Sequence, residues 1–457
     1  MTEKNPSSPF AIRNVRRFIA FRVCFNARFY YPVFAVLFLD FGLTLEQFAL
    51  LNAAWAATIV LLEVPSGALA DIIGRRNLLV VASVLMIAEL VLLCLAPQGG
   101  GQLLFAIFLA NRVLSGTAEA AASGADEAIA YDALKRDGRP EDWGRVLERQ
   151  IRYQSMGYVI AMSIGAAVYD PELLNRCMAG LGLALHFDPE TTLRFPLYLT
   201  LAMAVGALVQ TLGMEDIEFD KTLAKNGPGD HPHPIARTFK MIFQAGRWIL
   251  QTPMALCVIL AGLLFDHVIR VVITLNSQYL RAIHYPEASF GLIGSGLALM
   301  GLFIPKIAEW MDARFRPASN FLALAAMAVV GLTGIALFWP YVGLLPLALL
   351  SGVMMFTHFF SSRYLNQVTA SEQRATVLSF KGLSYNLAYG IAGLLYALLL
   401  AFLRQHPAII AAVGDKDLEV LVFERSFLCI PGYFILMLAV LIIVVRHQMK
   451  RHTEPSN

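Results

Sequence analysis

Long apolar runs alternate with short polar segments along almost the whole chain. A helix that crosses a bilayer needs roughly 20 apolar residues, and many of these runs are that long. The pattern therefore predicts membrane-spanning helices at residues 20–40, 46–70, 77–96, 103–133, 150–170, 194–213, 250–280, 288–308, 318–339, 341–365, 375–402 and 423–446.

A polar stretch from Glu215 to Trp248 separates the predicted spans into two sets of six. It contains the string GPGDHPHP, and Pro and Gly at that density break helices. We therefore predict an N-terminal six-helix bundle at 1–213, a cytoplasmic linker at 214–249 and a C-terminal bundle at 250–457. The predicted fold class is an all-α polytopic membrane protein with twelve transmembrane helices.

Composition supports a membrane protein and argues against an enzyme. Of 457 residues, 57% are hydrophobic and only 15% are charged, which is unlike an ordinary soluble chain. The net charge of +3 gives no reason to expect a nucleic-acid partner. The five cysteines lack metal-ligand spacing, and the chain has no phosphate-binding loop and no zinc-binding motif. We expect no catalytic activity, no metal and no cofactor.

Basic residues predict the orientation, because Lys and Arg accumulate in cytoplasmic loops. Placing both termini inside the cell puts most of the 36 basic residues on the cytoplasmic side. The basic residues that then face outward are Arg176, Arg194, Arg281, Arg404, Lys416 and Arg425.

The most specific motif is the polar hinge after the second span, which runs from Gly67 to Arg76. Its pattern, G-x-x-x-D-x-x-G-R-R, resembles the loop between helices 2 and 3 of the major facilitator superfamily. Gly67 would let a neighbouring helix approach closely, and Gly74 would permit a tight turn. Asp71 can accept hydrogen bonds from a helix N-terminus or from Arg75.

The resemblance implies two six-helix bundles that rock about a central cavity, in a protein that works as a monomer. The string Glu-Val-Pro-Ser-Gly beginning at Glu63 is similar to a bacterial subgroup of the superfamily. In the family, the hinge takes part in a latch that stabilises the outward-facing state, so the resemblance implies a conformational switch at the hinge and not a substrate site. Asp132 lies at the cytoplasmic end of the fourth span, at the depth of the hinge. It is therefore the first choice to contact Arg75 and Asp71, with Asp126 as the alternative.

The fourth span also carries Asn111-Arg112-Val113-Leu114-Ser115-Gly116, which resembles the family's R-x-x-x-G motif. There the arginine is linked to proton coupling, although a purely structural tether is the alternative. If the span is one continuous helix, Asp126 lies nearly on the face of Arg112, about 21 Å further along. Asp126 and Glu127 are proton-coupling candidates, or else a solvated helix end.

Charged residues inside apolar spans are costly and therefore face a cavity or a partner. In the seventh span, Asp266 and Arg270 are spaced i, i+4 and can bond each other, with His267 beside them. The carboxylate could carry a proton, or the pair could simply neutralise itself.

Three further positions complete the candidate set. Glu63, one turn before Gly67, could enter the cavity as a proton-coupling group or bond backbone donors freed by Pro65. Arg28 and Tyr31 make the centre of the first span unusually polar, so they are candidates for substrate contact. Arg112, Asp266 and Arg270 are the other substrate-binding candidates.

These features predict a secondary active transporter of the bacterial inner membrane, with both termini cytoplasmic. Our favoured function is proton-coupled efflux of a small organic compound, with protons, the substrate and the lipid bilayer as partners. The fifth span lacks the Gly-Pro pair common in the family's antiporters, which weakens the case for exchange. Uptake or flipping of an anionic metabolite or lipid is one alternative. A receptor or scaffold that no longer transports is another.

Overall fold

The computed structural model describes residues 8–215, 234–369, 374–411 and 417–453, and all regular structure within them is helical. The first half contains η1 (Pro9–Ala11), α1 (Arg13–Asn26), η2 (Tyr31–Val33), α2 (Phe34–Asp40), α3 (Leu45–Ile73), α4 (Arg75–Cys94), α5 (Gln102–Ala122), α6 (Ala125–Asp137), η3 (Pro140–Asp142), α7 (Trp143–Tyr169), α8 (Pro171–Gly180), α9 (Pro189–Thr192) and α10 (Phe195–Leu212).

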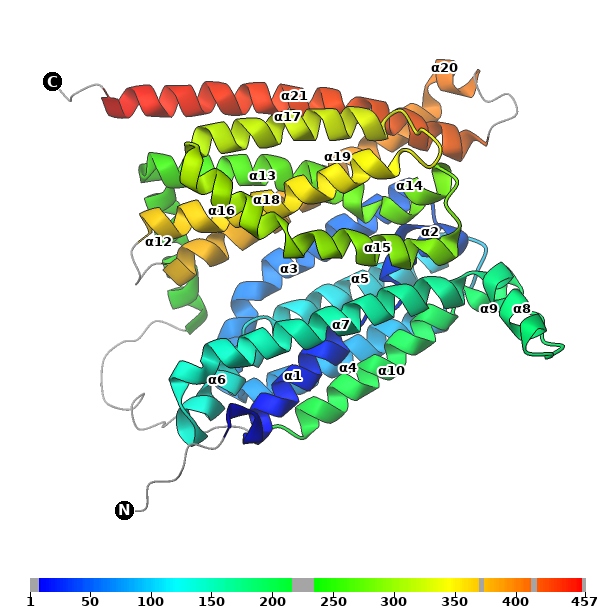
Figure 1. Ribbon diagram of the computed structural model, residues 1–457, viewed down its shortest axis with the longest axis horizontal. Helices are drawn as coiled ribbons and strands as arrows, with labels where there is room; N and C mark the ends of the chain where they lie inside the picture. Colours follow the sequence, from blue (N-terminus) through cyan, green and yellow to red (C-terminus); the bar gives the residue numbers. More distant parts are fainter. Residues whose placement is uncertain (1–7, 216–233, 370–373, 412–416, 454–457) are drawn as a thin grey trace.

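The second half contains α12 (Pro234–Gln251), α13 (Pro253–Thr274), α14 (Asn276–Ala282), η4 (Glu287–Ser289), α15 (Phe290–Leu299), η5 (Met300–Leu302), α16 (Ile304–Arg314), α17 (Pro317–Ile335), α18 (Leu344–Val368), α19 (Arg374–Gln405), α20 (Pro407–Ile410) and α21 (Leu418–Thr453). The two halves lie side by side as separate helix bundles (Figure 1). We call them the N half and the C half.

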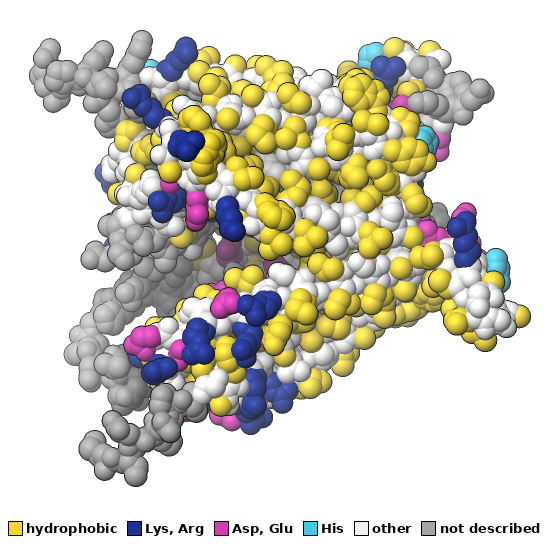
Figure 2. All heavy atoms as spheres, viewed as in Figure 1, with side chains coloured by type: hydrophobic (Ala, Val, Ile, Leu, Met, Phe, Trp, Pro, Cys, Tyr) yellow, Lys and Arg dark blue, Asp and Glu magenta, His cyan; other side chains and the backbone are white. Residues whose placement is uncertain are grey.

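Helix α1 starts and helix α21 ends at the same end of the molecule, on the left in Figure 1. We call this the termini end and the other the opposite end. Hydrophobic side chains cover the middle of the visible face, whereas most of the visible Lys and Arg gather towards the termini end (Figure 2). An apolar belt between polar ends is the surface that a bilayer requires.

Eleven helical segments within the described residues are long and apolar enough to cross a membrane. The predicted span at 150–170 is not among them, although it lies in the 27-residue helix α7. The first half of α7 carries Arg145, Glu148, Arg149 and Arg152, and these charges lower its mean hydropathy. The all-helical polytopic fold is thus confirmed, with eleven apolar spans found where twelve were predicted.

Several predicted spans prove to be broken helices, among them the first and the fourth. The first begins earlier than residue 20, as α1, and is interrupted before η2 and α2, where Pro32 cannot donate a backbone hydrogen bond. The fourth is divided into α5 and α6 at Gly124, whose φ of 75° is left-handed. Residues that carry a side chain favour right-handed backbone conformations, so a glycine at this position permits the break.

The predicted linker is also partly helical, because α12 occupies its second part. The GPGDHPHP string lies outside the described residues except for Pro234, at the start of that helix. Because α12 packs against α13, α19 and α3, this part of the linker contacts both halves.

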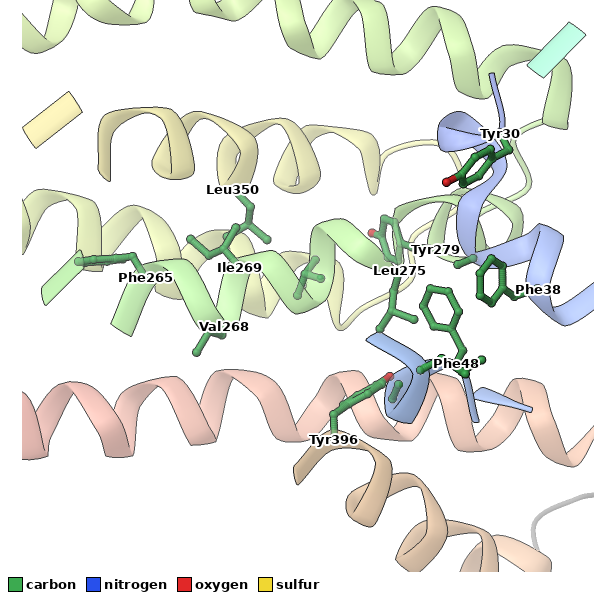
Figure 3. Close-up of a cluster of buried hydrophobic side chains, with 14 of the residues drawn as sticks. Tyr30, Phe38, Phe48, Phe265, Val268, Ile269, Leu275, Tyr279, Leu350 and Tyr396 are labelled. Carbon is green, nitrogen blue, oxygen red and sulfur yellow. The ribbon is translucent and has the colours of Figure 1, made fainter. Parts of the chain in front are cut away.

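The two halves pack tightly together towards the opposite end. Helix α3 runs against α19, and α7 runs against α15. A Cβ atom at Gly291 on α15 would lie 2.0 Å from the carbonyl oxygen of Met162 on α7, so only glycine fits there. Buried side chains from both halves, including Phe38, Phe48 and Tyr279, form an apolar cluster at this junction (Figure 3).

Candidate functional site

A cavity of about 340 Å³ is bordered mainly by helices of the N half and is also lined by Asn386 of α19 in the C half. We call it the central cavity. Figure 2 shows a hollow between the two halves towards the termini end, with acidic side chains in it. The lining residues are Arg22, Phe25, Trp55, Ile59, Glu63, Glu119, Ala120, Ala122, Ser123, Gly124, Asp126, Glu127 and Asn386.

The break between α5 and α6 places two of these carboxylates. Asp126 and Glu127 occupy the first turn of α6, and Arg22 on α1 lies 3.2 Å from Asp126 and 3.1 Å from Glu127. The continuous helix assumed in placing Asp126 on the face of Arg112 is wrong, because α5 ends at Ala122 and α6 begins at Ala125. Asp126 as the rival partner of Arg75 is not supported either, since its ion pair is with Arg22.

A buried polar chain crosses the N half beside the cavity. Arg28 forms an ion pair with Glu89 of α4, and their side chains are 3% and 0% exposed. The Asn111 amide donates to Glu89 at 3.2 Å, and the Asn111 carbonyl oxygen accepts from Arg112 at 3.1 Å. The Arg112 guanidinium also lies against the ring of Phe34.

Glu89 is the main residue that our sequence reasoning missed. The signal was present, since Glu89 interrupts an otherwise apolar run in the third span. Glu119 and Glu46 were missed in the same way. The partnership with Glu89 also changes the interpretation of Arg28, whose buried guanidinium is engaged inside the N half. Tyr31 is 43% exposed, so it remains available for contact with a solute.

The C half contributes a second buried ion pair. Arg270 bonds Asp266 at 2.6 Å across one helical turn of α13, and the Asp266 side chain is 0% exposed. The other arm of Arg270 donates to Asn386 at 2.9 Å. Because Asn386 lines the cavity, a chain of contacts connects Asp266 to it. His358 on α18 lies 3.9 Å from Asp266.

His267 has different neighbours from Asp266. One ring nitrogen contacts the carbonyl oxygen of Leu263 at 2.6 Å, and the other contacts the Tyr433 hydroxyl at 3.0 Å. His267 and Tyr433 line a separate, apolar pocket between α13, α19 and α21. We therefore drop His267 as a proton-coupling candidate for the central cavity and keep Asp266.

The hinge at the termini end has the predicted turn. Gly74 separates α3 from α4 with a φ of 89°, which favours glycine. Arg75 forms an ion pair with Asp132 of α6, the pairing expected from depth. The side chain of Asp71 lies outside the described residues. A Cβ at Gly67 would meet no described atom within 4 Å, so the predicted close helix approach at Gly67 is wrong for this conformation.

An ion-pair cluster joins the halves at the opposite end. Arg281, which follows α13 in the C half, donates to both carboxylate oxygens of Asp40 in the N half, at 2.7 and 2.6 Å. It also bonds Glu287 at 2.5 Å, while Tyr169 donates to Asp40. Burial alone would lower the pKa of Arg281, but Asp40 and Glu287 raise it, so the guanidinium stays charged.

Two further contacts between the halves lie at the same end. The backbone N–H of Ala288 donates to Asp170 at 3.2 Å, and Arg404 lies 2.8 Å from Glu46. We call Asp40, Arg281 and Glu287, with these two contacts, the opposite-end gate. In this conformation the gate is closed, while the hollow lies towards the termini end (Figure 2).

A match to the family's sequence profile decides the classification. The profile of the Major Facilitator Superfamily matches residues 18–393. The chain belongs to the Major Facilitator Superfamily. It is therefore a multi-pass membrane protein of a family of secondary transporters that bind small molecules, and it is not an enzyme. No curated protein matches the chain.

Solved structures of several transporters share the fold across nearly the whole chain. A bacterial homologue of the human lysosomal transporter Spinster, inward-facing and unoccupied, has a TM-score of 0.70 and 14% identity, covering 99% of this chain and 100% of its own. The D323A mutant of the nucleoside transporter NupG has a TM-score of 0.67 and 12% identity, covering 94% and 100%. A D-xylose–proton symporter has a TM-score of 0.62 and 12% identity, covering 93% and 97%. At these identities the likeness establishes the fold alone.

Proposed function

We propose that this protein exports a small organic compound in exchange for protons. The contact chain from Asp266 through Arg270 to Asn386 carries the proposal. A proton on Asp266 would cancel the charge that holds Arg270, and the released guanidinium would rearrange at the cavity wall. Asp126 offers a second carrier, because Arg22 and the cavity are its immediate surroundings.

The two ends of the molecule support movement by alternating access. The opposite-end gate joins the halves by ion pairs, which can be broken and remade without disrupting either bundle. The ion pair of Arg75 and Asp132 lies within the N half at the termini end. We propose that this pair and the Gly74 turn form the latch, and that the latch pair, which is formed here together with the closed gate, rearranges when the two halves move.

The proposed setting is the inner membrane of a bacterium, with the termini end in the cytoplasm and the protein acting as a monomer. The gathering of Lys and Arg towards the termini end supports this orientation. In it, the cavity of this conformation would take its solute from the cytoplasm. We retain the predicted division into bundles at 1–213 and 250–457, with α12 as a helical part of the connection.

The alternative of anion transport receives less support. It depended on a positive field from Arg28, Arg112 and Arg270. Arg28 is paired with Glu89, and Arg270 with Asp266. Of the three, Arg112 alone has no carboxylate partner among the described residues, and it is buried against Phe34 and Asn111.

Proteoliposomes with an acidic lumen test the proposed exchange. They should accumulate a radiolabelled compound from a panel of anions, cations and neutral molecules. Addition of nigericin, which collapses the pH gradient, should release it. Accumulation that is indifferent to nigericin, or that requires an alkaline lumen, would contradict proton exchange.

Arg281→Gln should weaken the opposite-end gate, because it removes the charge that holds Asp40 and Glu287. Each partly exposed ion pair contributes about 1 kcal/mol at most, so we expect the open population to rise severalfold. The readout is labelling of Asn52→Cys, a buried position in α3, by an impermeant maleimide added from the opposite side. The background has all five native cysteines replaced by alanine.

Arg176→Gln is the matched control for the gate. Arg176 lies on α8 and forms an exposed ion pair within its own helix, with Glu172. The control should leave labelling of the introduced cysteine unchanged. Equal labelling rates in Arg281→Gln and the parent would show that the cluster does not hold the halves together.

Arg75→Gln and Asp132→Asn should each slow transport, and the double variant should be no slower than the worse single variant. Two residues that act only through their mutual contact give such non-additive effects. Initial rates in proteoliposomes provide the measurement, with Arg152→Gln, on the exposed start of α7, as control. Additive losses would mean that the two residues do not form a common latch.

A further inference from the structure

Two carboxylates of the cavity have no cationic partner among the described residues. Glu63 and Glu119 both line the cavity. The Oε2 atom of Glu63 is buried and accepts no hydrogen bond from any described group. Glu119 is solvent-exposed, and its charged neighbours are Arg28, Glu89 and Arg22. A buried, unsatisfied carboxylate oxygen is costly unless a ligand donates to it or brings a positive charge.

The arginines nearest these carboxylates are already engaged. Arg28 pairs with Glu89, and Arg22 is shared between Asp126 and Glu127. The charge left over on the N-half wall of the cavity is therefore negative. Such a wall attracts cations and repels anions.

Charged groups of the C half do not cancel the negative charge on the wall of the cavity. Arg270 forms an ion pair with Asp266, and Lys381 interacts electrostatically with the same carboxylate. Lys381 also lies 5.7 Å from the centre of the Tyr385 ring. The C-half residue that lines the cavity is Asn386, which is neutral.

The remaining lining of the cavity is aromatic and apolar. Trp55 and Ile59 lie on α3, and Phe25 lies on α1. Trp55 and Glu63 thus come from one helix, two turns apart. An aromatic face attracts a cation through its quadrupole, and tryptophan does so most strongly. Carboxylates combined with tryptophan match the two recognition elements of a quaternary ammonium or similar ion.

We propose that the central cavity binds an organic cation with an apolar body, with Glu63 and Glu119 as counter-charges and Trp55 and Phe25 as the apolar wall. This inference rests on the proposed transport function and names its substrate class. Arg22, Asp126 and Glu127 form the polar border of the site.

Equilibrium binding to the detergent-solubilised full-length protein tests the site without any proton gradient. The probe is phenyltrimethylammonium, with tert-butylbenzene as its neutral isostere and benzenesulfonate as the anion of similar size. The cation should bind, and each analogue should bind at least about tenfold more weakly, as expected when an ion pair or cation–π contact is lost.

Glu63→Gln, Glu119→Gln and Trp55→Leu should each weaken binding of the cation, while Trp55→Phe should retain most of it. Glu148→Gln, which alters an exposed carboxylate of α7, should have no effect. A thermal-unfolding curve for each variant separates loss of the site from loss of the fold. If a carboxylate variant does not fold, the loss of binding in Trp55→Leu against its retention in Trp55→Phe supplies the comparison.

Three outcomes would overturn the proposal: no binding of the cation, equal binding of the cation and its isostere, or unchanged binding in the Glu63→Gln/Glu119→Gln double variant. Failure of the proposed function is distinguishable. Selective cation binding without proton movement in proteoliposomes would leave the site standing and remove the coupling. Proton-coupled transport of anions alone would leave the coupling standing and remove the proposed cation site.

Discussion

Asp266→Asn should reduce proton-driven accumulation of the substrate to the level of protein-free liposomes. The side chain is fully buried, it is bonded to Arg270, and Arg270 reaches the cavity through Asn386. Asparagine keeps the shape but cannot take up a proton, so the charge on Arg270 can no longer be switched. Exchange of labelled for unlabelled substrate, with no pH gradient, should persist because it needs no net proton transfer.

The persistence of exchange distinguishes lost coupling from a damaged protein. Asp312→Asn is the matched control, because Asp312 is also a C-half aspartate with an arginine partner, Arg363. It should retain proton-driven accumulation. Wild-type accumulation in Asp266→Asn would exclude this carboxylate as the proton carrier and leave Asp126 as the candidate. Loss of both accumulation and exchange would mean that Asp266 is needed for the fold or the moving bundle.

Glu89→Ala should cause the largest loss of stability among the substitutions considered, about 3–5 kcal/mol. The change leaves the Arg28 guanidinium buried without its carboxylate. It also removes one of the two acceptors of the Asn111 amide, the other being the backbone carbonyl oxygen of residue 89. Breaking one side of a buried ion pair is costly because the remaining charge is neither solvated nor paired. Thermal unfolding in detergent measures the effect.

The double variant Arg28→Met/Glu89→Leu should recover most of that stability, because replacing both charges with apolar groups leaves none unpaired. Glu148→Gln should change stability by less than about 0.5 kcal/mol, as expected for an exposed ion pair. If Glu89→Ala and the double variant unfold at the same temperature, the loss reflects packing and not an unpaired charge.

The sequence predicted the features that depend on neighbours along the chain. Apolar runs located the spans, the glycine at position 74 located the turn, and the i, i+4 spacing brought Asp266 to Arg270. The pairing of Arg75 with Asp132 was also predicted, because both residues lie at one depth and the helices carrying them meet at the hinge.

Features that depend on how separate helices rotate and meet were missed. Nothing near Arg28 in the sequence indicates that Glu89 faces it, since the orientation of α4 about its axis decides that contact. Arg281 was interpreted only as an outward-facing charge, because its partner Asp40 is on the other half. The helix break at Gly124 was missed because a single glycine within an apolar run is often tolerated.

Solute movement through this cavity should be tied to proton movement. Purified protein, reconstituted into liposomes that contain a trapped pH dye, tests it most directly when cationic, neutral and anionic solutes are added outside. We predict a solute-evoked rise in internal pH upon entry of a cation, absent in Asp266→Asn and in protein-free liposomes. Entry of the solute with no change of internal pH, or with acidification, would contradict the account.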